Sequence, residues 1–391
     1  MFSRVRFRSR LRKNSSRAVS VFRFDLAPGP YGVGLSVIEQ YDRSRAFEGR
    51  TRTARPLQTL LWYPAECGRV APMTVADYVN LWASETTFES PTMPARAQAW
   101  IAGMKATLAL PLCARRDVPR MSGRFPVSIY APSNSAPSWE NADLCEYLAS
   151  HGYVVLASPC MGAEAREMTL DLPGIDAQAR DIAFLIDFAN TLPNTDVTAV
   201  AAIGFSWGGL ANVFAAARDG RLRALICLDG SLRSSPGLVQ KAADVQPERM
   251  TIPLLSVAQG QWTPEDQDRW WSQYPEHAGP SVLNAWTHGD LVSVYMLGLS
   301  HMEHSAMYQR NEDAWQKVLH VYGQKRADYG RVDGIVGYAW IARYALQFLN
   351  AYLKGDAAAM TFLKTEPSRN GAPRHFIASS YRAAVPLDDA R

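Results

Sequence analysis

The chain has 391 residues, of which 47% are hydrophobic, and a formal net charge of +4. A chain of this length and apolar content can bury a substantial core. It contains no run of about 18 apolar residues, so no membrane-spanning helix is predicted. The five cysteines are dispersed without a C-x-x-C pair, which argues against a zinc site or a disulfide framework.

The N-terminal segment differs in charge from the rest of the chain. The first 24 residues carry eight basic side chains and no acidic one, so the rest of the chain has a net charge of about −4. Residues 1–27 are expected to form a disordered basic arm. A basic arm could touch nucleic acid or an anionic membrane surface, but the rest of the chain is mildly acidic, so no nucleic-acid partner is expected. No secretory signal is visible; a cytoplasmic location is slightly favoured, and an organellar transit peptide or a misassigned start codon stays open.

Two strands are predicted first, at 35–41 and 57–63, and their proximity indicates an antiparallel pair. Residues 71–123 contain two helix-like stretches rich in Trp and Met, at 74–84 and 95–108, and are predicted to form a helical insertion before the third strand.

Strands and helices then alternate, which indicates an α/β fold with a mostly parallel sheet covered on both faces. The predicted strands are 126–130, 153–157, 197–203, 224–228, 253–258 and 292–297, and the predicted helices are 141–150, 177–191, 210–218 and 338–353. One domain is expected to span 28–355, followed by a C-terminal extension at 356–391.

The sequence GFSWGG at 204–209 lies between a predicted strand and a predicted helix. A serine framed by glycines in this context is typical of a nucleophile elbow. Gly204 and Gly208 would let the strand and the helix approach closely enough to expose the Ser206 hydroxyl. The Trp207 amide, at the positive end of the helix, would be free to bind an oxyanion. The alternative is a surface turn with an incidental serine.

A serine nucleophile needs a histidine to take its proton and a carboxylate to orient that histidine. His301 follows the last predicted parallel strand and is the preferred base, with His304 as the alternative. Asp229 ends the strand after the elbow and is the preferred acid, although an Asp-Gly pair is also common in turns. Glu265 and Asp266, after the next strand, are the alternative acids.

A second oxyanion donor is expected from the loop at 131–139, which follows the strand at 126–130. Its small polar residues suit a close approach of the backbone, but it lacks the usual His-Gly or Gly-Gly pair. Asn134 is the candidate donor in this loop.

Together these motifs resemble the platelet-activating factor acetylhydrolase-like branch of the α/β-hydrolases, which is related to the dienelactone hydrolases. The resemblance covers roughly residues 28–355 and rests on Ser206 in GFSWGG, Asp229 in ALICLDG and His301 in GLSHMEHSA. It implies an α/β-hydrolase fold with these residues as a Ser-His-Asp triad. The sequence departs from the family at 132–135, where Pro-Ser-Asn-Ser replaces a His-Gly-x-Gly loop, and from dienelactone hydrolases in having a serine nucleophile instead of a cysteine.

The sequence therefore predicts a serine hydrolase that cleaves a small-molecule carboxylic ester through an acyl-enzyme, with no cofactor and no metal. Trp139, Trp207 and Trp262, near predicted loop ends, indicate an apolar pocket or ordinary core packing. Two alternatives remain: an amidase or peptidase that uses the same triad, and a catalytically silent binding protein, since a fold alone does not establish activity.

Overall fold

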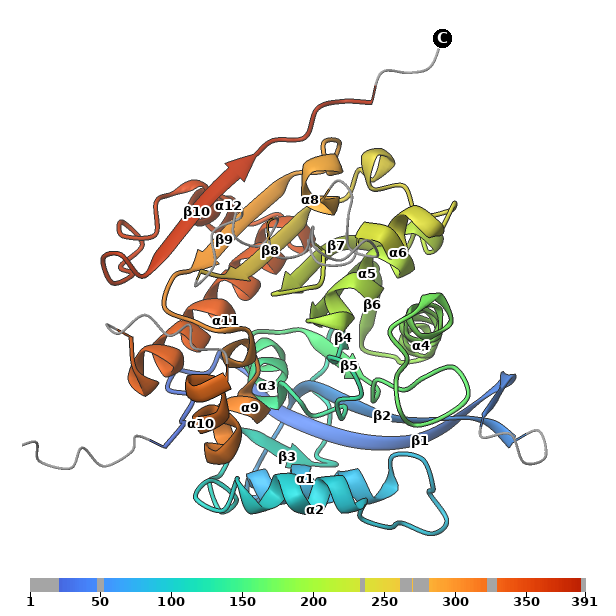
Figure 1. Ribbon diagram of the computed structural model, residues 1–391. Coiled ribbons are helices and arrows are strands. Elements are labelled where there is room, and N and C mark those ends of the chain that lie inside the picture. Colours follow the sequence, from blue (N-terminus) through green and yellow to red (C-terminus); the bar gives the residue numbers. More distant parts are fainter. Residues whose placement is uncertain are drawn as a thin grey trace, which may run out of the picture.

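The computed structural model describes residues 21–47, 53–232, 236–260, 269, 281–321 and 329–387. Within these ranges ten strands form one mixed sheet (Figure 1). The strands are β1 (Gly32–Phe47), β2 (Thr53–Ala65), β3 (Ala114–Arg116), β4 (Phe125–Ala131), β5 (Val154–Ala157), β6 (Thr195–Phe205), β7 (Leu222–Leu228), β8 (Leu254–Gln259), β9 (Leu291–Met296) and β10 (Ile377–Arg382). The helices are α1 (Val75–Asn80), α2 (Ala95–Ala102), α3 (Ala142–Ser150), α4 (Leu172–Asn190), α5 (Trp207–Arg218), α6 (Pro236–Lys241), α8 (Val282–Ala285), α9 (Ala306–Arg310), α10 (Glu312–Val321), α11 (Arg331–Leu353) and α12 (Ala357–Lys364).

The strand order in the sheet is β10-β9-β8-β7-β6-β4-β5-β2-β1-β3. Neighbouring strands from β5 to β9 are parallel, whereas β1 pairs antiparallel with β2, and β2 pairs antiparallel with β5. The predicted antiparallel opening and mostly parallel sheet are therefore confirmed. Because parallel strands point the same way, the carboxyl ends of β6, β7, β8 and β9 lie along one edge of the sheet.

Helices cover both faces of the sheet (Figure 1). α3 and α11 pack on one face and α4 and α5 on the other, each pair over its own hydrophobic core. Successive side chains of β6 alternate between these cores: Ala201 and Ile203 lie in the first, Val200 and Ala202 in the second. A strand that is buried on both faces needs apolar residues at every position, which explains this uninterrupted apolar run.

Helices α4, α2 and α11 differ clearly from their predicted bounds, and α11 begins at Arg331 instead of at 338. α4 begins ahead of the predicted 177–191, because the Asp171 side chain accepts a hydrogen bond from the Gly174 N–H and a proline stands in the first turn. α2 ends at its Ala102 boundary instead of continuing to 108, since Gly103 follows and glycine disfavours a helix interior.

The segment predicted as an insertion, 71–123, holds α1, α2, a 3₁₀ helix at Leu81–Ser84 and the unforeseen short strand β3. β3 pairs parallel with β1 and so attaches the segment to the edge of the sheet. α1 begins in a capping box, in which Thr74 and Asp77 each accept a hydrogen bond from the other's backbone N–H.

Segments near both ends of the described chain pack onto the sheet domain. Phe22, within the predicted arm at 1–27, is fully buried and lies edge-on to Tyr338 of α11 with ring centroids 5.4 Å apart. Residues 1–20 lie outside the described residues. β10, within the predicted extension at 356–391, pairs antiparallel with β9. The division into arm, domain and extension stays a prediction.

The junction between β6 and α5 is so closely packed that only glycine fits. A Cβ on Gly204 would collide with the backbone of Gly208. A Cβ on Gly208 would collide with the carbonyl oxygen of Ala131 and lie 2.7 Å from that of Pro132. The strand, the helix and the loop after β4 therefore meet backbone to backbone.

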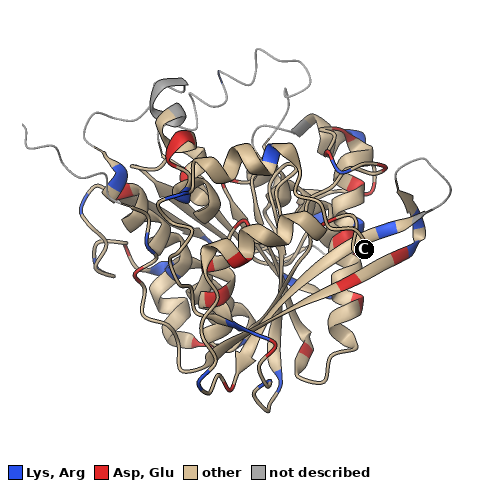
Figure 2. Ribbon diagram, turned by 90° about the horizontal axis from the view of Figure 1, so that it is seen from below, with Lys and Arg blue, Asp and Glu red and all other residues tan. Residues whose placement is uncertain are grey.

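Charged residues of both signs are interspersed along the described ribbon (Figure 2). Several form ion pairs on the surface: Arg218 pairs with Asp176 and Asp244, and Arg221 pairs with Asp187. Among the helices that the structure describes, none is both long enough and apolar enough to cross a membrane.

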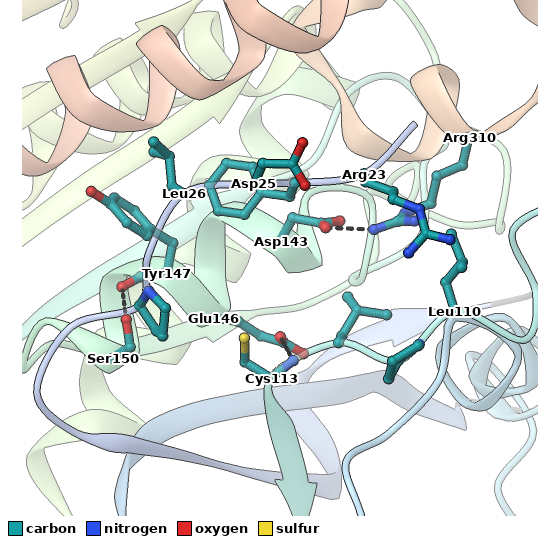
Figure 3. Close-up of a pocket in the computed structure, with 14 residues that line it drawn as sticks. Arg23, Asp25, Leu26, Leu110, Cys113, Asp143, Glu146, Tyr147, Ser150 and Arg310 are labelled. Carbon is teal, nitrogen blue, oxygen red and sulfur yellow. Dashed lines mark hydrogen bonds and ion pairs between the residues drawn. The ribbon is translucent and has the colours of Figure 1, made fainter. Parts of the chain in front are cut away.

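A cavity lies between α3 and the chain from Arg23 to Pro28 (Figure 3). Glu146 of α3 lines it, with a buried carboxylate that accepts hydrogen bonds from the Tyr78 hydroxyl and the Cys113 N–H, each over 2.5 Å. Burial raises the pKa of Glu146 to about 7, because the loss of hydration outweighs these hydrogen bonds.

We expect Glu146→Gln to remove a pH dependence of stability. With its pKa raised from 4.5 to about 7, the folded protein keeps a proton that the unfolded chain releases, so the free energy of unfolding falls as pH rises through this window. The shift corresponds to about 3 kcal/mol. In urea unfolding, the free energy of unfolding of the variant minus that of the wild type should rise by up to about 3 kcal/mol between about pH 4.5 and pH 8. A difference that is the same at both pH values would contradict this expectation.

We also expect Gly208→Ala to destabilise the protein by at least about 1–3 kcal/mol, the usual range for overpacking, because the backbone carbonyls that the new Cβ meets cannot rotate away. The matched control is Gly220→Ala, where a Cβ meets nothing within 4 Å. Thermal unfolding should show a lower midpoint for the first variant and an unchanged or slightly higher one for the second. Equal midpoints for the two variants would show that the junction tolerates a side chain.

Candidate active site

Ser206 stands between the end of β6 and the start of α5 and is half-buried. Its φ of +53° lies in the left-handed region that favours glycine. The conformation is held by backbone hydrogen bonds of 3.0 Å, from the Ser206 N–H to the Leu228 carbonyl and from the Gly209 N–H to the Ser206 carbonyl. A strained serine between a strand and a helix is the geometry of a nucleophile elbow.

A continuous chain of hydrogen bonds joins Asp229, His301 and Ser206. The His301 Nδ1 lies 2.5 Å from the Asp229 Oδ2, and its Nε2 lies 3.0 Å from the Ser206 Oγ. A carboxylate can only accept, so the neutral imidazole carries its proton on Nδ1 and can accept the serine proton at Nε2. The three residues singled out as nucleophile, base and acid are thus brought together, from the carboxyl ends of β6, β7 and β9.

Asp229 is anchored to β8, the strand next to its own. Its N–H donates to the Val257 carbonyl over 2.5 Å, and its Oδ1 accepts from the Gln259 N–H over 3.0 Å. Burial on its own would raise the pKa of Asp229, but the hydrogen bond and charge of His301 outweigh it and the pKa is lowered. The carboxylate is therefore ionised at neutral pH and suited to stabilising an imidazolium.

His301 begins a 3₁₀ helix, His301–His304, that follows β9. A capping box fixes its start: the Glu303 Oε2 accepts from the Ser300 N–H over 2.8 Å and from the Ser300 hydroxyl over 2.9 Å. The imidazole packs on the Phe205 ring with centroids 4.9 Å apart, and its side chain keeps 35% of its surface exposed. The ring is oriented by the protein yet accessible to a substrate.

The alternative base, His304, lies in the interior. Its side chain is fully buried, and its Nδ1 lies 3.1 Å from the Ser300 carbonyl and 3.2 Å from the His301 carbonyl. Burial lowers the pKa of His304, although the nearby Asp229 charge opposes this. The hydrogen bonds described for His304 do not include one to Ser206. The geometry therefore favours His301 as the base.

The Trp207 amide opens α5, and among the described contacts it has no hydrogen-bond partner. This is the normal state of an N–H in the first turn of a helix. It leaves the group available to an anion next to Ser206, and its role as an oxyanion donor stays a prediction.

The loop predicted to supply a second oxyanion donor is held by hydrogen bonds on either side of Asn134. Before it, the Pro132 carbonyl accepts from the Gln178 Nε2 over 2.8 Å. After it, the Ser135 carbonyl accepts from the Arg166 Nη1 over 3.3 Å, and Ser135 adopts a φ of +54°. Asn134 itself is exposed, and in the described part of the chain its N–H has no hydrogen-bond partner.

Glu140 is a buried residue of this region that was not among the predicted site residues. Its Oε2 accepts from the Ser133 N–H and from the Tyr130 hydroxyl, each over 2.9 Å, and its Oε1 accepts from the Ser133 hydroxyl. Burial raises the pKa of Glu140 to about 7, although these hydrogen bonds and the charge of His301 oppose the rise. The available signal was an acidic residue between the candidate oxyanion loop and a predicted helix.

The remaining predicted residues are placed as follows. The rings of Trp139 and Trp207 are buried in the two separate cores, so both contribute to core packing, and among the described residues their indole N–H groups have no hydrogen-bond partner. Trp262 and the alternative acids Glu265 and Asp266 lie outside the described residues. Within the described residues, no group of three or more His, Cys, Asp or Glu side chains could hold a metal ion.

The fold is shared with a solved structure. The chain is similar to a ferulic acid esterase from Streptomyces cinnamoneus, with a TM-score of 0.62 and 18% sequence identity over 90% of this chain and 98% of that one. No protein-family model matches the sequence, and no curated protein matches it. At this identity the similarity establishes the fold alone, and it confirms the predicted α/β-hydrolase fold class.

Proposed function

We propose that this protein is a serine hydrolase that cleaves carboxylic esters of small molecules. The observation that carries the proposal is the hydrogen-bonded chain from Asp229 through His301 to Ser206, built on a strained elbow next to a free helix N-terminus. A histidine poised between a serine hydroxyl and an ionised carboxylate is the arrangement that activates a serine nucleophile.

In the proposed reaction, His301 takes the hydroxyl proton of Ser206 while the serine oxygen attacks the ester carbonyl. Asp229 stabilises the imidazolium that forms, and the amides of Trp207 and Asn134 donate to the oxyanion. His301 then gives the proton to the leaving alcohol, which produces an acyl-enzyme. Water, deprotonated by His301, attacks the acyl-enzyme, and the acid leaves as Ser206 regains its proton.

Two further observations support this choice. The acid follows the strand next to the elbow, as in the platelet-activating factor acetylhydrolase-like branch that the sequence motifs resemble, and we propose membership of that branch. The solved structure reported above, which shares this fold over nearly its whole length, is that of an esterase, and this favours ester over amide cleavage. Both points go beyond the fold and are part of the proposal.

Replacement of the nucleophile gives the direct test. The wild type should release a burst of p-nitrophenol from p-nitrophenyl acetate and react with a fluorophosphonate probe, because both reactions need an activated serine. Ser206→Ala should lose the burst and the labelling while keeping the thermal midpoint of the wild type. The absence of both reactions in the folded wild type would exclude the proposed function.

A second pair of variants tests the acid. In Asp229→Asn the amide can donate to the His301 Nδ1 and so favours the tautomer with its proton on Nε2, which cannot take the Ser206 proton. We therefore expect kcat to fall by about 10⁴-fold. Asp266→Asn, at the alternative position, should retain kcat within about two-fold of the wild type. If the second variant loses activity and the first does not, Asp266 is the acid.

A further inference from the structure

The turn at Glu140 and Asn141 contacts the candidate oxyanion loop through its side chains. The Glu140 carboxylate accepts three hydrogen bonds: two from Ser133, through its N–H and hydroxyl, and one from the Tyr130 hydroxyl. Tyr130 in turn accepts from the Asn141 Nδ2 over 2.7 Å. All of these groups are buried, so their hydrogen bonds do not compete with solvent and hold the loop in one position.

The same turn also holds the segment that carries His301. The Glu140 carbonyl accepts from the Met307 N–H over 3.0 Å. The Asn141 side chain accepts from the Ala306 N–H over 2.8 Å and donates to the His304 carbonyl over 3.2 Å. The two halves of the site are thus connected through two adjacent residues at the start of α3.

The loop needs such an anchor because it has no glycine. Ser135 adopts a φ of +54°, in the left-handed region that glycine reaches without strain and serine does not. Pro132, Ser133 and Ser135 are each bound by neighbouring groups, whereas the Asn134 N–H has no partner in the described part of the chain. The backbone on either side of that one N–H is therefore immobilised.

We propose that Glu140 is a positioning residue, whose carboxylate holds Ser133 so that the Asn134 N–H is presented to the oxyanion formed at Ser206. The proposal rests on the proposed function, since it assigns the second donor of that reaction. Glu140 does not touch the reacting atoms; it acts through Ser133. A donor displaced by about 1 Å can cost about 10²-fold in rate, so such an anchor has a measurable effect.

Glu146, which lies within α3, provides a matched control. It is also buried, accepts from one tyrosine hydroxyl and one backbone N–H, and has its pKa raised to about 7 by burial, as Glu140 does. Its partners, Tyr78 and Cys113, belong to the segment at 71–123 and not to the oxyanion loop. Cys113 is seen next to Glu146 in Figure 3. Truncating it removes a comparable set of buried hydrogen bonds without releasing Ser133.

The experiment compares Glu140→Ala, Glu140→Gln and Glu146→Ala with p-nitrophenyl acetate at about pH 8. Glu140→Ala should lower kcat at least about ten-fold with KM within about two-fold, because the oxyanion is bound in the transition state and not in the ground state. Glu140→Gln should recover most of kcat, since an amide oxygen at Oε2 still accepts from Ser133 and Tyr130. Glu146→Ala should keep kcat within about two-fold of the wild type, whatever its thermal midpoint.

A short-chain trifluoromethyl ketone reports on the oxyanion hole directly. Ser206 adds to its carbonyl carbon, the C=O π bond becomes an oxyanion, and His301 takes the serine proton. Its inhibition constant should rise in Glu140→Ala by the same factor as kcat/KM falls, and should stay unchanged in Glu146→Ala. If Glu140→Ala does not fold, Glu140→Asp replaces it, with a carboxylate retracted by one methylene and an intermediate loss expected in both measurements.

The outcomes separate this inference from the function on which it rests. An active wild type in which Glu140→Ala or its Asp replacement matches Glu146→Ala in kcat and in ketone binding overturns the positioning role and leaves the hydrolase intact. A loss of kcat without a matching loss of ketone binding, or without recovery in Glu140→Gln, also overturns it. A wild type that shows no burst overturns both proposals.

Discussion

The close approach of three backbone segments at Gly208 sets the geometry on which the site depends. There the first turn of α5 touches the carbonyls of Ala131 and Pro132, at the point where β4 passes into its loop. Ser206, the amide of Trp207 and the candidate oxyanion loop are thereby placed within one small region. The parallel strands β7 and β9, on either side of β8, then bring Asp229 and the segment of His301 to the same edge, where the chain of hydrogen bonds forms.

The pKa values of two carboxylates near His301, those of Asp229 and Glu140, are shifted in opposite directions by their surroundings. Asp229 receives a hydrogen bond from the imidazole itself, which lowers its pKa despite burial, and it stays charged at neutral pH. Glu140 receives its hydrogen bonds from neutral groups, and burial raises its pKa to about 7. Carboxylates with such different environments perform different tasks. In the proposed reaction Asp229 stabilises the charge that develops on His301, whereas Glu140 is proposed to hold the backbone of Ser133 in place.

The sequence predicted those parts of the site that depend on local order along the chain. Ser206, Asp229 and His301 each follow an apolar strand, and the parallel pairing of these strands brings the three residues to one edge of the sheet. Glu140 was missed because its partner Ser133 is seven residues away in an irregular loop, and only the folded chain turns the two together. The start of α11 was missed for a related reason: Gly337 lowers helical propensity locally, yet it leaves the space that Leu299 fills next to the His301 segment.

The loop at 132–135 shows how side chains can replace glycine in a tightly shaped turn. Glycine reaches a left-handed φ without strain but leaves the backbone free to move. Here Ser135 adopts the strained φ itself. The Pro132 and Ser135 carbonyls accept hydrogen bonds from α4 and from Arg166, and the Ser133 N–H donates to Glu140. Such a loop is rigid because each anchor removes an alternative conformation. Rigid donors that need no reorganisation are what electrostatic stabilisation of an oxyanion requires, so the loss of the glycines is compatible with the chemistry proposed for Ser206.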